Sequence, residues 1–205
     1  MPRAFTQEEL EKIRAKLLSK GKILFEKYGY KKFGIRDLTS EVGIANGMFY
    51  RFFESKETFF LEIIRTEKYK IRKRIAAEIM KHKDNPAKAL KCFYRIIVKE
   101  LYENALMNTI LHKNEYSFIL ENMSSDDMID EREKSLELIV ELMNDWKSKH
   151  LMKDIDAVEV IGAIRSLVYL NFHKEEIGLD QYDAIIDFLL NRICDYAIID
   201  GGRDE

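Results

Sequence analysis

The sequence predicts an all-α protein of about nine helices. Only two Pro and nine Gly interrupt its 205 residues, too few to end many short strands. Apolar residues recur three or four positions apart along most of the chain, which is the spacing of one helix face. The composition, with 46% hydrophobic and 34% charged residues, is that of a soluble globular protein.

No targeting or membrane segment is expected. The N-terminal run MPRAFTQEELEK is too charged for a signal peptide, and no apolar run approaches the roughly 18 residues of a membrane span. We therefore expect a cytoplasmic protein that makes no membrane contact.

The first helix is expected over about residues 7–28. Thr6 and Glu9 have the spacing of a capping box, in which each residue satisfies a free backbone N–H of the other. Apolar residues from Ile13 to Tyr28 follow at helical spacing and define the face that this helix buries.

Two short helices follow, at about 35–41 and 46–52. The turn between them is Val42-Gly43-Ile44. Gly43 can adopt a positive φ without a Cβ clash, so it suits the residue that closes a helix. The pattern indicates a helix-turn-helix.

The second of these helices needs support from packing. Asn46, Gly47 and Met48 are poor helix formers, so neighbouring apolar residues such as Phe49 and Phe53 must hold it in place. Its remaining face carries Asn, Gly, Tyr and Arg, which can approach and bond base edges or phosphates. This indicates a DNA-reading helix.

Charge supports a polyanion partner at this end of the chain. Residues 1–75 hold 18 Lys and Arg against 10 Asp and Glu, whereas the remainder holds 16 against 26. A basic N-terminal part and an acidic C-terminal part are typical of a nucleic-acid-binding domain joined to a soluble body.

The run LFEKYGYKKFGIRDLTSEVGIANGMFYRFFESKE resembles the DNA-binding domain of the TetR family of transcriptional regulators. The matching residues, without a gap in their spacing, are Gly29-Tyr30, Asp37-Leu38, Gly43-Ile44, Gly47, Phe49-Tyr50, Phe53 and Ser55-Lys56-Glu57. The resemblance implies a helix-turn-helix domain at 1–54 and a helical effector-binding and dimerisation domain at 55–205. A helix over about 55–82 would connect them.

The expected partner of the first domain is double-stranded DNA. The expected DNA-binding residues are Arg36, Thr39, Ala45, Asn46, Gly47, Met48, Tyr50, Arg51 and Lys56. Asn46 is the expected base reader and Met48 would pack on a thymine methyl, while the basic residues would hold phosphates.

Three positions depart from the family pattern. The family usually has Ser or Thr where this chain has Gly34 and Ala45, and often has Thr where it has Met48. Losing such an N-cap side chain typically costs about 1 kcal/mol. The loss of hydroxyls that often bind phosphate leaves an alternative open, a helical protein-interaction module with weakened or lost DNA binding.

Five further helices are expected after the connector. Asn85-Pro86 marks the restart, because Asn caps a helix and Pro suits its first position. The expected ranges are about 86–103, 108–121, 126–149, 157–174 and 180–199.

The apolar residues of the last two of these helices predict a homodimer. Apolar residues occupy nearly every side of residues 158–172, more than one internal face can bury. Together with the apolar stripe of the last helix they would form a four-helix interface between two subunits, as the TetR resemblance also implies. The expected interface residues are Ile161, Gly162, Arg165, Ser166, Tyr169, Ile185, Ile186, Leu189 and Ile193.

The resemblance also implies a pocket for a small-molecule effector in the second domain. The candidate lining residues are aromatic, Met or His side chains, namely Phe93, Tyr94, Met107, His112, Tyr116, Trp146, Tyr169 and Phe172. An amphipathic or aromatic effector is the expected ligand class. An ordinary hydrophobic core is the alternative for each of these side chains.

No enzyme, cofactor or metal site is expected. A di-iron bundle needs Glu three residues before His, and none of the four His has it. The sequence has no phosphate loop, zinc spacing or nucleophile motif. Cys92 and Cys194 stand alone and are interpreted as buried apolar residues, with a redox sensor as the unsupported alternative.

Overall fold

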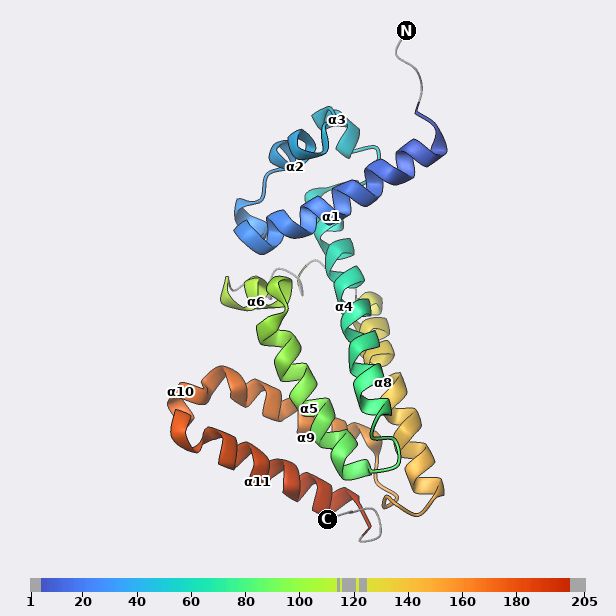
Figure 1. Cartoon of the computed structure of the whole chain (residues 1–205), viewed down its shortest axis with the longest axis vertical. Coiled ribbons are helices and arrows are strands. Elements are labelled where there is room, and N and C mark those ends of the chain that lie inside the picture. Colours follow the sequence, from blue (N-terminus) through green and yellow to red (C-terminus); the bar gives the residue numbers. More distant parts are fainter. Residues whose placement is uncertain (1–4, 114, 116–120, 122–124, 200–205) are drawn as a thin grey trace. The chain divides into compact units, whose positions relative to one another are not determined.

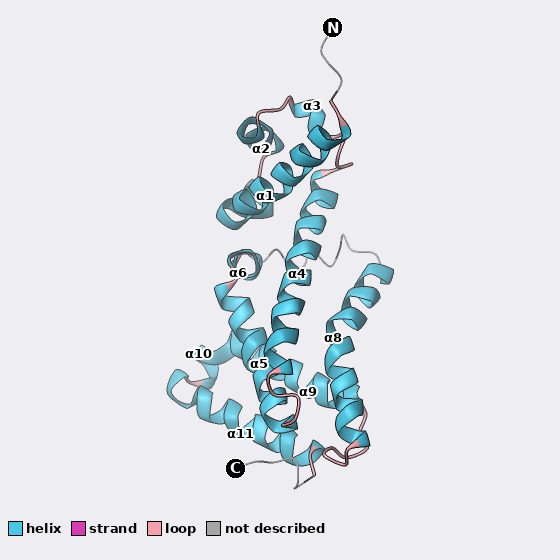
Figure 2. Ribbon diagram, turned by 45° about the vertical axis from the view of Figure 1, so that its right-hand side comes forward, coloured by secondary structure: helices cyan, strands magenta, loops and turns pink. Residues whose placement is uncertain are grey.

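The computed structural model describes residues 5–113, 115, 121 and 125–199, of which 125–135 are described by their backbone alone. Within this part of the chain every regular element is a helix, and the only β pairing is an isolated bridge between Met152 and Ile198. The prediction of an all-α protein is confirmed (Figures 1 and 2). No described helix is long and apolar enough to cross a membrane.

The chain forms two compact units, each with its own core. The head unit comprises Met1–Lys70 and Tyr102–Met128, and the body unit comprises Ile71–Leu101 and Ile129–Glu205. Helix α4 (Lys56–Met80) contributes residues to both. These units are defined by contacts, so the functional division after residue 54 stays a prediction.

The head unit contains α1 (Gln7–Lys32), α2 (Ile35–Val42), α3 (Asn46–Phe49), the first part of α4 and α6 (Ala105–His112). The predicted capping box begins α1, with Glu9 N donating to Thr6 Oγ1 at 3.2 Å and Thr6 N donating to Glu9 Oε2 at 2.7 Å. Near its other end α1 is kinked at Gly29, whose φ of 74° is not helical.

Aromatic side chains form the centre of the head core. Phe25, Phe33, Phe49, Phe53, Phe59 and Phe60 are all buried. Phe59 reaches α1 because Gly21 has no side chain, since a Cβ there would lie 2.3 Å from Phe59 Cζ. A residue with a Cβ at this position would therefore force the Phe59 ring to move.

The body unit contains most of α5 (Pro86–Glu103) and α8 (Ser125–Ser148), with α9 (Ala157–Leu170), a 3-10 turn (Asn171–His173), α10 (Lys174–Ile177) and α11 (Leu179–Ala197). Asn85 caps α5 as predicted, because its Oδ1 accepts from Lys88 N at 2.9 Å. Trp146 is fully buried in this core, and its ring N–H donates to the Lys83 carbonyl at 2.5 Å.

Several predicted boundaries were wrong by a few residues. Helix α6 begins at Ala105 rather than near 108, because Asn104 Oδ1 accepts from Met107 N and so caps it earlier. Helix α9 ends at Leu170, where a 3-10 turn follows. The helix expected over 108–121 is described only as far as His112, where α6 ends, and most of its expected remainder lies outside the described residues.

Candidate nucleic-acid interface

The turn between α2 and α3 has the geometry that the sequence predicts. Gly43 adopts φ 80° and ψ 35°, and its N–H donates to the Thr39 carbonyl at 3.0 Å. Ile44 N donates to the same carbonyl at 3.0 Å, so the chain reverses direction with its backbone groups satisfied. This fixes where α3 begins.

Helix α2 begins without a side-chain cap. Gly34 provides no side-chain cap, but a Cβ at this position would lie 2.6 Å from Asp37 Oδ2. The Asp37 carboxylate therefore lies beside the N-terminus of α2. A carboxylate there also interacts favourably with the helix dipole.

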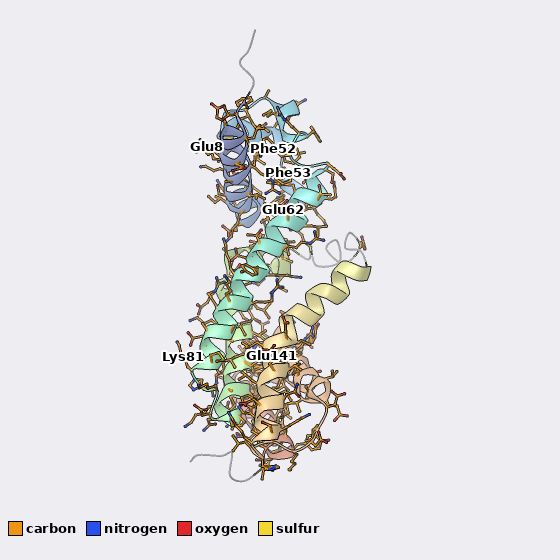
Figure 3. All side chains as sticks on the ribbon, turned by 90° about the vertical axis from the view of Figure 1, so that its right-hand side faces the viewer. Glu8, Phe52, Phe53, Glu62, Lys81 and Glu141 are labelled. Carbon is orange, nitrogen blue, oxygen red and sulfur yellow. The ribbon has the colours of Figure 1, made fainter. Side chains whose placement is uncertain are left out.

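Helix α3 is held by the aromatic core of the head. Phe49 is completely buried, and its ring centroid lies 5.3 Å from that of Phe59 in an edge-to-face arrangement. The ring centroids of Phe53 and Phe59 are 4.6 Å apart, and the Arg14 guanidinium lies over the Phe53 ring. The guanidinium of Arg14, on α1, also donates to the two carboxylate oxygens of Glu62, on α4, at 2.6 and 2.7 Å. Phe53 and Glu62 are labelled in Figure 3.

The regular part of α3 is shorter than predicted. It ends at Phe49, and the chain continues to residue 52 as a turn in which Arg51 N donates to Met48 O and Phe52 N to Phe49 O. Poor helix formers at its start and the absence of a side-chain cap at Ala45 are consistent with this short helix.

Most of the predicted DNA-binding residues are exposed in the head unit. Arg36, Ala45, Asn46, Gly47, Tyr50 and Arg51 are exposed, and Met48 is half-buried. The space around Gly47 is open, with no atom within 4 Å of where a Cβ would stand. A large partner can therefore approach the backbone at this point.

Thr39 is placed differently from the other candidates. Its side chain is 2% exposed, and its hydroxyl donates to the carbonyls of Ile35 at 3.0 Å and Arg36 at 3.2 Å. The residue packs inside the head and bonds its own helix. We therefore leave it out of the proposed interface.

Lys56, the first residue of α4, lies over two aromatic rings and near two carboxylates that the sequence alone did not place beside it. Ser55 Oγ accepts from Thr58 N at 3.1 Å and caps the helix. The Lys56 ammonium lies 4.3 Å from the Tyr30 ring centroid and 5.7 Å from that of Phe33. Burial lowers the pKa of this ammonium, and the Glu57 and Glu115 carboxylates oppose that decrease.

Tyr30 and Glu57 complete this site, and the sequence did not reveal their role. The Tyr30 hydroxyl donates to Glu57 Oε1, and this hydrogen bond is the main cause that lowers the pKa of the Glu57 carboxyl. Burial, followed by the interaction with Glu57, raises the pKa of Tyr30. The two residues are 27 positions apart, so no local pattern could pair them.

Comparison with known proteins agrees with this geometry. Residues 17–63, which span most of α1 through the first turns of α4, match the family model of bacterial regulatory proteins of the tetR family. The chain has a TetR-family DNA-binding domain. No match is found among curated protein sequences.

Solved structures extend the likeness to the TetR fold of the whole chain. A Mesorhizobium loti protein assigned to the TetR family of transcriptional regulators shares 12% identity, with a TM-score of 0.73 over 95% of this chain and 100% of its own. A TetR-family transcriptional regulator from Pectobacterium atrosepticum shares 17% identity, with a TM-score of 0.67 over 92% of this chain and 94% of its own. The fatty acid degradation regulator FadR from Bacillus halodurans shares 15% identity, with a TM-score of 0.59 over 93% of this chain and 96% of its own. The chain therefore shares the helical fold of these three proteins.

The predicted dimer residues separate into three groups by their exposure. Ile161 and Ile186 are buried within the body core, whereas Gly162, Ser166 and Tyr169 are exposed on α9. Arg165, Ile185, Leu189 and Ile193 are half-buried. Exposed apolar side chains outside the predicted interface set lie on the same two helices, namely Val158, Phe188 and Tyr196.

The predicted effector residues are not brought together. Phe93, Tyr94 and Trp146 are buried in the body core, whereas Met107 packs against the head core. His112, Tyr169 and Phe172 are exposed, and Tyr116 lies outside the described residues. Their assignment to one pocket stays a prediction.

Proposed function

We propose that this TetR-family protein is a homodimeric repressor that binds a palindromic DNA operator and is released by a small-molecule effector. The observation that supports it most is that Asn46, Gly47, Tyr50 and Arg51 are exposed in α3 and the turn after it, whereas Phe49 between them is buried. Polar side chains on a rigid base can be held at base edges and phosphates with little loss of conformational entropy.

Asn46 and Lys56 have different proposed roles. Asn46 is exposed in the first turn of α3 and would read a base edge. Lys56, at the capped start of α4, would hold a phosphate together with the free N–H groups of that helix. The ring of Tyr30 beneath the ammonium limits the directions in which Lys56 can point.

The test is a selection of the purified full chain against random duplex DNA. An anisotropy titration of the enriched sequence at several salt concentrations follows. A repressor of this kind enriches a palindrome and binds it with a steep salt dependence. Failure to enrich any sequence would contradict the proposal and favour the helical interaction module.

Two variants separate the proposed roles. Lys56→Ala should weaken binding to all sequences alike and make the salt slope shallower by about one. Asn46→Ala should change which sequence is enriched. If Lys56→Ala changed the preferred sequence and left the salt slope unaltered, the two roles would be wrongly assigned.

The proposed dimer uses the outer faces of α9 and α11. Tyr169 is 59% exposed on α9, and Phe188 and Tyr196 are 60% and 58% exposed on α11. Large apolar side chains gathered on two helices of one unit mark an interaction surface. A second copy of the chain would cover them and give the two-fold symmetry that a palindromic operator matches.

The proposed effector site lies in the body core around Tyr94. Its hydroxyl lies 3.3 Å from that of Tyr182, and Asn171 Nδ2 donates to it at 3.5 Å. All three side chains are buried among apolar residues, and a few polar groups in an apolar site are what orient a small ligand. For any effector that releases DNA, Tyr94→Phe should change the effector concentration required and leave DNA affinity alone.

A further inference from the structure

The body unit has a surface groove that neither the DNA-binding surface nor the dimer face uses. It has a volume of about 390 Å³, within the range of about 300–1,000 Å³ that small ligands occupy. Residues of α4, the following turn and α5 line it: Glu78, His82, Lys88, Lys91, Cys92, Arg95, Ile96 and Lys99.

One face of α5 supplies four cations to this groove. Lys88, Lys91, Arg95 and Lys99 follow one another three or four positions apart, so their side chains emerge from one face of the helix. Like charges at this spacing repel one another and weaken the helix.

The described carboxylates around the groove leave the charges of Lys88 and Lys91 unpaired. Glu78 bonds Lys81 at 2.6 Å, outside the lining. Arg95 has Asp187 at 3.5 Å, and both of their side chains are more than 60% exposed, where an ion pair contributes little. Within the described part of the chain, neither Lys88 nor Lys91 has an ion pair.

The lining is not charged throughout. Cys92 and Ile96 are half-buried between the cations and give the groove an apolar strip. Figure 3 labels Lys81, which lies just beyond the end of α4 beside this region. The groove therefore offers several positive charges next to a small apolar surface.

We propose that this groove binds a small organic anion carrying two or more acidic groups on an apolar body. The acidic groups would pair with Lys88, Lys91 and Arg95, and the apolar body would cover Cys92 and Ile96. Two separated anionic groups match the spread of the cations better than one. The site does not require DNA binding or dimerisation.

The probe for this site is naphthalene-1,5-disulfonate, a flat ring with two permanent anionic groups. Its intrinsic fluorescence allows an anisotropy titration with the full chain at low ionic strength, where exposed charges are least screened. The uncharged analogue is 1-naphthol. The double variant Lys88→Gln/Lys91→Gln removes two charges from the groove, and Lys83→Gln/Lys149→Gln removes two exposed charges from the same unit outside it.

A second readout locates the bound probe. Cys92 lines the groove and Cys194 is buried elsewhere, so the rate at which N-ethylmaleimide labels Cys92 reports occupancy. Bound disulfonate should slow that labelling, and 1-naphthol at the same concentration should not.

The expected result is saturable disulfonate binding that is about tenfold weaker in Lys88→Gln/Lys91→Gln and unchanged in the control variant. Any of three results would overturn the proposal. These are no saturable binding up to about 1 mM, equal loss in the two variants, and saturable binding that leaves Cys92 labelling unchanged.

Discussion

Asn104 Nδ2 donates to the buried carboxylate of Glu67 at 2.6 Å, and the Oδ1 of the same Asn104 caps α6. Glu67 is 3% exposed on α4 and also bonds Lys22 of α1 at 2.7 Å. Burial tends to raise the pKa of the Glu67 carboxyl, but the hydrogen bonds from Lys22 and Asn104 outweigh it and the pKa is lowered. One amide thus joins the start of α6 to α4 inside the head unit.

Replacing Asn104 should destabilise the head. Asn104→Ala removes the cap of α6 and one donor to a buried carboxylate, for a combined cost of about 2 kcal/mol. Urea unfolding followed by circular dichroism measures the loss. Asn104→Asp keeps a capping oxygen but loses the donor and places a second carboxylate beside Glu67, so it should also be less stable than the original chain. If Asn104→Asp were as stable as the original chain, the bond to Glu67 would contribute nothing.

Two glycines with positive φ should respond differently to Ala. Gly29 has φ 74°, and a Cβ there would lie 2.6 Å from Glu115 Oε1 and from Lys113 Cδ. Gly43 has φ 80° and nothing within 4 Å of its Cβ position. Gly43→Ala should cost only the backbone strain, about 1 kcal/mol, whereas Gly29→Ala should cost more because neighbouring atoms must also move. Equal thermal unfolding midpoints for the two variants would contradict this difference.

Gly47→Ala should separate DNA affinity from stability. The new methyl group meets open space in the head, and Ala favours a helix over Gly by about 1 kcal/mol, so stability should be unchanged or increased. Affinity for the enriched operator should nevertheless fall about tenfold if DNA approaches the backbone at this position. Ser148→Ala, at an exposed residue of α8 outside both proposed interfaces, is the control. Unaltered DNA affinity in Gly47→Ala would mean that DNA does not approach there.

Tyr30→Phe should lower stability in a pH-dependent way. The bond from Tyr30 lowers the pKa of Glu57, so it contributes stability above the unfolded-state pKa of that carboxyl, about 4.3. The contribution is lost as pH falls through the folded-state value. We expect a deficit of about 1 kcal/mol at pH 7 that disappears in acid, measured by urea unfolding across pH. A deficit that stays the same at all pH values would indicate lost packing instead of this bond.

Phe188→Glu should disrupt the proposed dimer. Phe188 is 60% exposed on α11, so a carboxylate there is compatible with the folded subunit but not with a buried apolar interface. Sedimentation velocity should show a shift to monomer, with the helical content preserved. The control is Phe5→Glu, at an apolar residue of the head that is 48% exposed and outside the proposed interface. A dimer that persisted in Phe188→Glu would place the interface elsewhere.

Local patterns in the sequence determined much of the fold. The helix-turn-helix was predictable because Gly43 and the spacing of Leu38, Phe49 and Phe53 specify a turn and a buried face within about 16 residues. The capping residues Thr6, Ser55 and Asn85 were equally predictable, because each bonds a backbone N–H three residues away. Such relationships depend on short separations that a single sequence displays.

Tertiary structure decided which side chains meet. The sequence could not show that Thr39 faces inward, that Tyr30 bonds Glu57, or that Asn104 bonds Glu67 from 37 residues away. Nor could it show that Tyr94 and Met107, both candidates for one pocket, lie in different cores. Helical spacing indicates which residues share a face, but the packing of helices against one another sets what that face contacts.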